Sequence, residues 1–166
     1  MVSTHHQELG WCPIFERGTV DHLDAIMRIE ESSFSAPWTR RMFEVELTDN
    51  PFARLLTTHI GHADQSSKES RDLGGYVCFW VVFEELRMMN LAVSPRVRRR
   101  GIGRGLLHQA LTMGRQEGAR RALLEVRVSN HPAVALYEHA GFLRSGVRTN
   151  YYTNPVEDAV LMELEL

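Results

Sequence analysis

A glycine-rich turn preceded by arginines is the part of the chain whose residue types and spacing most directly indicate chemistry. Its glycines follow an apolar stretch and precede a helix pattern. Glycine lets a backbone approach an anion closely, and the first N–H groups of a helix carry partial positive charge. The alternative is an ordinary strand-to-helix turn with arginines on its surface. The residues of the predicted phosphate site are Arg98, Arg99, Arg100, Gly101, Ile102, Gly103 and Arg104.

Two well-known phosphate loops do not fit this turn. Gly101, Gly103 and Gly105 lack the spacing of the dinucleotide-binding fingerprint. No Gly-Lys-Ser/Thr sequence follows them, so the support for a P-loop is weak as well. The sequence therefore does not predict a nucleotide-binding fold.

A carboxylate in an apolar strand pattern is the next candidate. Leu124, Val126 and Val128 alternate along the chain, so they are predicted to share one face of a strand. Glu125 then lies on the other face, where its carboxylate is a candidate for a functional role. The alternative for this residue is a solvated or cross-strand ion pair.

The helix that follows carries a tyrosine with a similar pair of interpretations. Asn130 is a good N-cap and Pro132 suits the first turn, so a helix is predicted to begin here and to end at Gly141. Tyr137 lies on this helix and is a second candidate for a functional role. Its alternative role is an aromatic ring packed against the sheet with its hydroxyl satisfied.

Length and composition limit what the chain can be. With 166 residues, 43% of them apolar, it can form one domain with a substantial core but not two of ordinary size. A net charge of −2 gives no overall attraction to nucleic acid or to an anionic membrane. Cys12 and Cys78 match no metal or redox spacing, and we expect no metal site. Without a signal sequence or a membrane-spanning apolar run, a cytoplasmic protein is expected.

The elements that must position these residues can be read from the apolar patterns. Their predicted order is β-α-α-β-β-β-α-β-α-β-β, which indicates an α/β fold whose mixed central sheet is flanked by helices. The predicted strands cover 13–19, 52–60, 75–83, 86–93, 122–128, 143–151 and 158–166. Asp21 is predicted to cap the first helix, and the second is predicted to begin after Pro37. The other two predicted helices cover 102–117 and 132–139. We expect a single domain over 1–166, with a flexible extension at 1–12 and an exposed polar loop at 61–72.

Several segments together resemble a known family. Arg98-x-x-Gly101-x-Gly103 is similar to the acetyl-CoA pyrophosphate loop of the GNAT superfamily of N-acetyltransferases. The string Leu-Glu-Val-Arg-x-Ser-Asn at 124–130 and the string Ala-Leu-Tyr-Glu-x-x-Gly-Phe at 135–142 resemble its RimI-type protein N-terminal acetyltransferases. Two further segments resemble the same enzymes. One is 31–38, which ends in Pro-Trp, and the other is the Tyr-Tyr pair at 151–152 followed by Glu-Asp-Ala at 157–159. The resemblance covers about residues 20–165, and the loop at 61–72 departs from it.

The resemblance implies a GNAT fold and transfer of an acetyl group from acetyl-CoA to the α-amine of a protein. Glu125 would be the base, acting directly or through a water, and Tyr137 the acid that protonates the departing thiolate. A backbone N–H near Val93 would stabilise the oxyanion. The resemblance implies that the cofactor's pantetheine contacts Leu91, Ala92 and Val93, and that its pyrophosphate contacts the phosphate turn. Asn130 and Tyr137 are also implied to contact the cofactor.

The resemblance also implies an acceptor site and a class of partner. Phe34, Pro37 and Trp38 would form one wall of the peptide entrance, and Tyr151 and Tyr152 the other. Trp38 has an alternative role as a hydrophobic staple at a helix start. The implied acceptor is a protein N-terminus, such as ribosomal small-subunit protein 18 in bacteria. Two alternatives stay open: the chain acetylates a small amine or a lysine, or it is a CoA-binding module without turnover. The oligomeric state also stays open.

Overall fold

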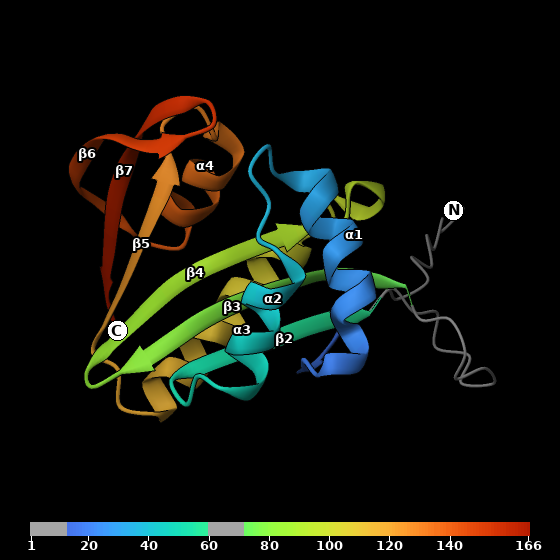
Figure 1. Cartoon of the computed structure of the whole chain (residues 1–166). Helices are drawn as coiled ribbons and strands as arrows, with labels where there is room; N and C mark the ends of the chain where they lie inside the picture. Colours follow the sequence, from blue (N-terminus) through green and yellow to red (C-terminus); the bar gives the residue numbers. More distant parts are fainter. Residues whose placement is uncertain (1–12, 60–71) are drawn as a thin grey trace, which may run out of the picture.

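The computed structural model describes residues 13–59 and 72–166, which form one sheet with helices on both of its faces (Figure 1). The predicted extension at 1–12, and the predicted loop at 61–72 except its last residue, lie outside the described residues. The strands are β1 (Ile14–Arg17), β2 (Ala53–His59), β3 (Leu73–Val82), β4 (Glu85–Val93), β5 (Arg121–Arg127), β6 (Leu143–Thr153) and β7 (Val156–Glu165). The helices are α1 (Leu23–Ser33), α2 (Arg40–Thr48), α3 (Ile102–Gln116) and α4 (His131–His139), with short 3-10 turns at Val20–His22 and Pro95–Val97.

The sheet is mixed, as predicted. Its seven strands lie in the order β1-β2-β3-β4-β5-β7-β6. Strands β4 and β5 pair in parallel, and every other neighbouring pair is antiparallel. The helix α3 connects the parallel pair, because parallel neighbours need a crossover. The predicted element order and fold class are therefore confirmed.

Two hydrophobic cores cover the two faces of the sheet. On one face, α3 and α4 bury residues such as Leu106, Leu107 and Val134 against the strands. On the other face, α1 and α2 bury Ile26 and Phe43. The central strand β3 contacts both cores and is buried along nearly its whole length, as its continuous apolar run predicts.

Two local predictions were wrong. Asp21 does not cap the first helix: Thr19 caps the 3-10 turn before it, and the Thr19 backbone N–H donates to His22 Nδ1 at 3.0 Å in a capping box. Val128 does not share the buried face of Leu124 and Val126, because β5 ends at Arg127 and Val128 is 46% exposed.

Candidate active site

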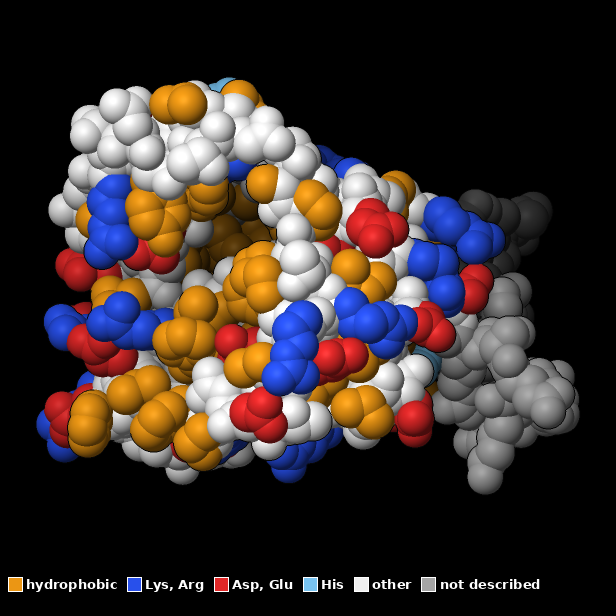
Figure 2. Space-filling model, in the orientation of Figure 1, with side chains coloured by type: hydrophobic (Ala, Val, Ile, Leu, Met, Phe, Trp, Pro, Cys, Tyr) orange, Lys and Arg blue, Asp and Glu red, His pale blue; other side chains and the backbone are white. Residues whose placement is uncertain are grey.

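The site is organised by the separation of β4 from β5. The two strands pair only over Glu85–Arg87 and Arg121–Leu123, at their beginnings. Beyond this point β4 stays paired with β3 and β5 stays paired with β7, so within the described chain their facing edges have no partner strand. Figure 1 shows the two strands diverging, and Figure 2 shows a hollow lined by hydrophobic side chains at this place. An extended ligand can therefore pair with the free edge of β4.

The predicted phosphate turn lies at the open end of β4. Gly101 has a φ of +81°, a left-handed conformation that glycine adopts without strain, and it is the N-cap of α3. The first helical bond runs from the Gly105 N–H to the Gly101 carbonyl at 2.9 Å. The N–H groups before Gly105 open the helix and have no intrahelical acceptor. Arg99, Arg100 and Arg104 are exposed around this helix end, which suits it to an anion.

Arg98 holds this region together within the protein. Its Nε donates to the Val93 carbonyl at 3.1 Å, and its Nη2 donates to Ser33 Oγ at 3.1 Å. The side chain thus connects the end of β4 to the end of α1. Leu91 and Val93 are half-buried on the α3 face, whereas Ala92 is buried in the core under α1.

Glu125 lies on β5 on the face opposite Leu124 and Val126, as the strand pattern predicts. Its Oε1 lies 3.3 Å from Arg148 Nη1 of β6, and the carboxylate side chain is 32% exposed. The ion pair that was the alternative for this residue is therefore present. The carboxylate nevertheless stays accessible, so the pair does not exclude its use as a base.

Tyr137 lies on α4 and is almost fully buried. Its ring packs edge-on against Phe142 at a centroid distance of 5.7 Å. Burial, with a smaller effect from Tyr152, raises the pKa of the Tyr137 hydroxyl to about 12. The phenol therefore stays protonated at neutral pH. Asn130 caps α4 as predicted, since its Oδ1 accepts from the Ala133 N–H at 3.3 Å.

Tyr152 interacts electrostatically with both predicted catalytic residues. Burial is the main cause that raises the pKa of Tyr152 to about 12, and Tyr151 and the Glu125 carboxylate contribute to this rise. The electrostatic effects of Glu125 on Tyr152 and of Tyr152 on Tyr137 place all three groups in one neighbourhood. The rings of Tyr151 and Tyr152 contact each other edge-on at 5.1 Å.

The two predicted acceptor walls meet directly. The Ser35 hydroxyl of the α1–α2 segment donates to the Asn154 carbonyl of the β6–β7 turn at 3.0 Å. Trp38 precedes the α2 N-cap and packs on Phe43 at a ring distance of 5.2 Å, which is the staple position. Phe34 is half-buried and Pro37 is exposed on the same segment. The structure thus joins the 34–38 segment to the end of the tyrosine-bearing hairpin.

Comparison with known proteins decides the family. Residues 23–142 match the model of the acetyltransferase (GNAT) family. A chain from Bacillus subtilis is 39% identical over 144 residues, which is 86% of this chain and 89% of that one. The chain belongs to the acetyltransferase (GNAT) family.

A named relative and two solved structures agree with this acetyltransferase assignment. The [ribosomal protein bS18]-alanine N-acetyltransferase of Escherichia coli is 34% identical over 146 residues, covering 87% of this chain and 91% of its own. A crystal structure of the Escherichia coli enzyme has a TM-score of 0.78 at 28% identity, covering 93% of this chain and 94% of that one. Arabidopsis thaliana NAA60 in complex with acetyl-CoA, at 17% identity, shares the fold with a TM-score of 0.81 over 93% and 99% of the two chains.

A buried carboxylate of the acetyltransferase was missed by the sequence analysis. Glu30 on α1 is 1% exposed. Its Oε1 accepts from the Trp38 N–H at 2.6 Å, its Oε2 accepts from the Tyr76 hydroxyl, and Asn90 Nδ2 donates to both oxygens at 3.2 and 3.1 Å. It thus fixes Trp38, at the end of the 34–38 segment, to β3 and β4. The signal was available, because Glu30 falls on the apolar stripe of Leu23 and Ile26.

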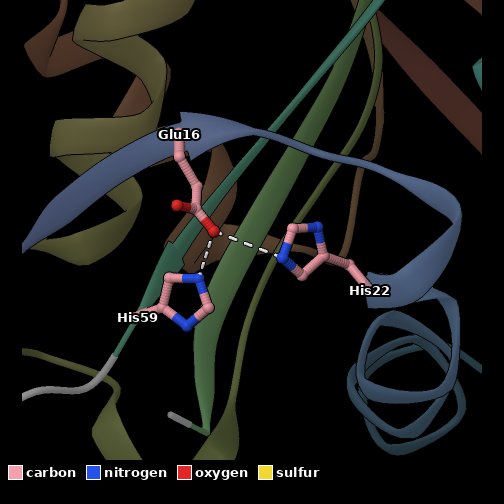
Figure 3. A group of neighbouring side chains, drawn as sticks. All are labelled: Glu16, His22 and His59. Atoms are coloured by element: carbon pink, nitrogen blue, oxygen red, sulfur yellow. Dashed lines mark hydrogen bonds and ion pairs between the residues drawn. The ribbon is translucent and has the colours of Figure 1, made fainter. Parts of the chain in front are cut away.

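A second cluster of the acetyltransferase has the composition of a metal site. Glu16 of β1, His22 of the first 3-10 turn and His59 of β2 point toward one another (Figure 3), and their ligand atoms lie within 4.8 Å. Because the Thr19 N–H donates to His22 Nδ1, the ring proton of a neutral His22 lies on Nε2, which faces Glu16 Oε1 at 3.2 Å. A metal at Nε2 would need the opposite tautomer. We therefore interpret the cluster as hydrogen bonds that join β1, the turn and β2.

Within the ranges 13–59 and 72–166, none of the helices has the length and apolar character needed to cross a bilayer.

Proposed function

We propose that this acetyltransferase modifies the N-terminal α-amine of a protein. The observation that carries the proposal is the Ser35–Asn154 hydrogen bond, which joins the two acceptor walls. An extended chain end is narrow enough to enter between joined walls, whereas a lysine on a folded surface brings bulky backbone with it. The Escherichia coli relative, named for acetylation of an alanine of ribosomal protein bS18, supports the same class of acceptor.

The chemistry requires a neutral amine. An α-amine has an ordinary pKa of about 7.7–8.0, so part of it is already neutral near pH 7. Acetyl-CoA supplies an activated acyl group as a thioester. The amine nitrogen forms a bond to the thioester carbonyl carbon, the carbon–sulfur bond breaks, and the nitrogen loses one proton. Glu125 is proposed to take that proton, directly or through a water.

Tyr137 is proposed to donate to the sulfur that leaves. The raised pKa of its hydroxyl, about 12, keeps the proton on the phenol at neutral pH. The same rise makes the phenol a weaker acid than a free tyrosine, so its main contribution is a hydrogen bond to the developing thiolate. The proton follows as the carbon–sulfur bond breaks.

The donor is proposed to lie along the free edge of β4, with its pyrophosphate at the start of α3. Leu91, Ala92 and Val93 offer backbone groups to the pantetheine amides, and the turn at 98–104 offers N–H groups and arginines to the phosphates. Asn130 uses its Oδ1 in the α4 cap, which leaves its amide N–H groups as the donors for a cofactor contact.

Replacing Gly103 by Val is expected to weaken acetyl-CoA binding more than replacing Arg99 by Ala. A Cβ at Gly103 would lie 3.5 Å from Val93 Cγ2 and 3.6 Å from Leu136 Cδ2, so the larger side chain would fill the space between β4 and α4. An arginine on an exposed helix end adds only a screened charge. Calorimetry should give a loss of about 10-fold or more for Gly103→Val and about 3-fold for Arg99→Ala. The reverse order would contradict this placement of the donor.

Replacing Tyr152 by Phe is expected to raise the KM for an alanyl peptide about 5-fold and to leave acetyl-CoA affinity unchanged. The Tyr152 hydroxyl stays protonated at neutral pH and can donate to the first peptide groups of the acceptor. The ring is expected to stay in place, because its contact with the Arg127 guanidinium, 4.1 Å from the ring centroid, does not involve the hydroxyl. Steady-state kinetics with each substrate varied separately test this, and a change confined to acetyl-CoA affinity would contradict it.

The setting of the reaction is part of the proposal. We propose one catalytic domain acting in the cytoplasm on a newly made ribosomal protein, with bS18 as the first candidate. The test compares a short peptide beginning with alanine, free alanine and a polyamine as acceptors. The peptide should be acetylated far faster than the other two, because only it carries the peptide groups that the acceptor walls can recognise. Preference for the polyamine would overturn the proposal.

A further inference from the structure

Arg148 lies where the substrate amine must approach the proposed base. Arg148 on β6 places its Nη1 3.3 Å from Glu125 Oε1, and its guanidinium carbon lies 5.5 Å from the centroid of the Tyr151 ring. A carboxylate and an aromatic face are also the partners that a cationic amine would use. The guanidinium therefore marks the position at which an α-amine approaches the proposed base.

The neighbouring arginine is held differently. Arg127 donates to the carbonyls of Asn154 and Pro155 at 3.0 and 3.1 Å and to Glu157 at 3.2 Å, and its guanidinium lies over Tyr152. With these contacts and an exposed side-chain fraction of 20%, Arg127 is fixed. The Arg148 side chain is 54% exposed and can move aside while its charge stays near.

The other charged groups around Arg148 already have partners. From β7, Glu157 accepts the Ser129 N–H at 2.6 Å and pairs with Arg127, and Asp158 accepts the Asn150 N–H at 2.8 Å. From β5, Glu125 pairs with Arg148 itself. The tyrosines at 137 and 152 are neutral at neutral pH, because the pKa of each is raised to about 12. Once an amine displaces Arg148 from Glu125, the displaced guanidinium is an extra positive charge close to the amine.

We propose that Arg148 favours the neutral, nucleophilic form of the substrate α-amine. The inference depends on the proposed function, since it concerns the amine at Glu125. A positive charge beside an amine disfavours the ammonium form and so lowers the pKa of the bound amine. Glu125 then receives the proton, and the amine keeps the electron pair with which it attacks the thioester. The arginine thereby lets the enzyme work below the ordinary pKa of an α-amine.

The experiment measures single-turnover acetyl transfer to an alanyl peptide, with peptide and acetyl-CoA saturating, from pH 6 to 9.5. For Arg148→Gln we expect the acidic limb of the pH–rate profile to shift to higher pH by about half a unit to one unit. The rate at pH 6.5 should fall about 3–10-fold, and the two proteins should converge above pH 9. Arg148→Lys should restore most of the wild-type profile, because it restores the charge.

Arg144→Gln is the matched control. Arg144 lies on the same strand, is 58% exposed, and pairs with Glu138 of α4 at 2.9 Å. The pH–rate profile of Arg144→Gln should be the same as that of the wild type. If the rate of Arg148→Gln were lower than that of the wild type by the same factor at every pH, Arg148 would have a structural role. If the rate were higher at low pH, Arg148 would only compete with the amine for Glu125. If the rate were unchanged, Arg148 would have no role in the reaction. Each of these outcomes overturns the inference while peptide acetylation by the wild type still supports the proposed function.

Discussion

Glu125→Gln is expected to lower kcat for an alanyl peptide by about 100-fold or more. The amide keeps the size of the side chain but cannot take the proton that the attacking amine loses. The affinity for acetyl-CoA should stay within 2-fold of the wild type, about the scatter of such measurements, because the donor is proposed to lie along β4 and not beside Glu125. Steady-state kinetics and calorimetry measure the two effects separately.

Glu138→Gln is a control for the loss of a partly exposed carboxylate. Glu138 lies on α4 and pairs with Arg144, outside the proposed acceptor site. It should leave kcat unchanged. The deficit of Glu125→Gln should narrow as the pH rises, since more of the amine is then neutral without help from a base. A near-normal kcat in Glu125→Gln would mean that Glu125 is not the base and forms only a structural ion pair.

Glu30→Ala is expected to destabilise the protein by about 2–4 kcal/mol. The substitution removes the acceptor for the Trp38 N–H, the Tyr76 hydroxyl and the Asn90 amide in a buried region. It also releases the acceptor segment from the sheet, so the KM for peptide should rise. Glu31→Ala, the exposed neighbour, should change the free energy of unfolding by no more than about 0.5 kcal/mol. Denaturant unfolding of both variants measures the difference.

The pH dependence of stability gives a second test of Glu30. Burial outweighs its hydrogen bonds and raises its pKa above the ordinary 4.5. A carboxyl group with a raised pKa in the folded state contributes most stability below its ordinary pKa and loses that contribution as the pH rises through the folded value. The free energy of unfolding of the wild type, relative to Glu30→Gln, should therefore fall as the pH rises from about 4.5. A difference that grows with pH would contradict the burial effect.

The fold was predictable because local signals agreed along the chain. Apolar runs, the caps at Asn130 and Gly141, and the glycine turn at 101 gave the element order, and β3 is buried as its composition predicts. The predicted site residues could be placed on elements, but their roles stay predictions. The strand-end boundary at Arg127 was missed, because the apolar alternation continues through Val128, whose N–H still donates to the Asp158 carbonyl of β7 at 3.2 Å.

What could not be predicted depends on contacts between distant segments. The Ser35–Asn154 hydrogen bond joins residues 119 positions apart. The pairing of Arg148 with Glu125 crosses β7, and the position of Arg98 between α1 and β4 uses an arginine that the sequence assigned to phosphate. Glu30 was detectable, since a charge on an apolar helix stripe indicates a buried partner. Its three donors, however, come from segments whose arrangement only the folded sheet defines.

The central claim is acetylation of a protein α-amine, and two matched peptides test it most directly. One begins with a free alanine and contains a lysine, and the other has the same sequence with its α-amine blocked. After incubation with acetyl-CoA and the wild-type enzyme, mass spectrometry locates the new acetyl group. We predict one acetyl group on the alanine nitrogen of the first peptide and no reaction of the second. Efficient acetylation of the lysine in the blocked peptide would contradict the account.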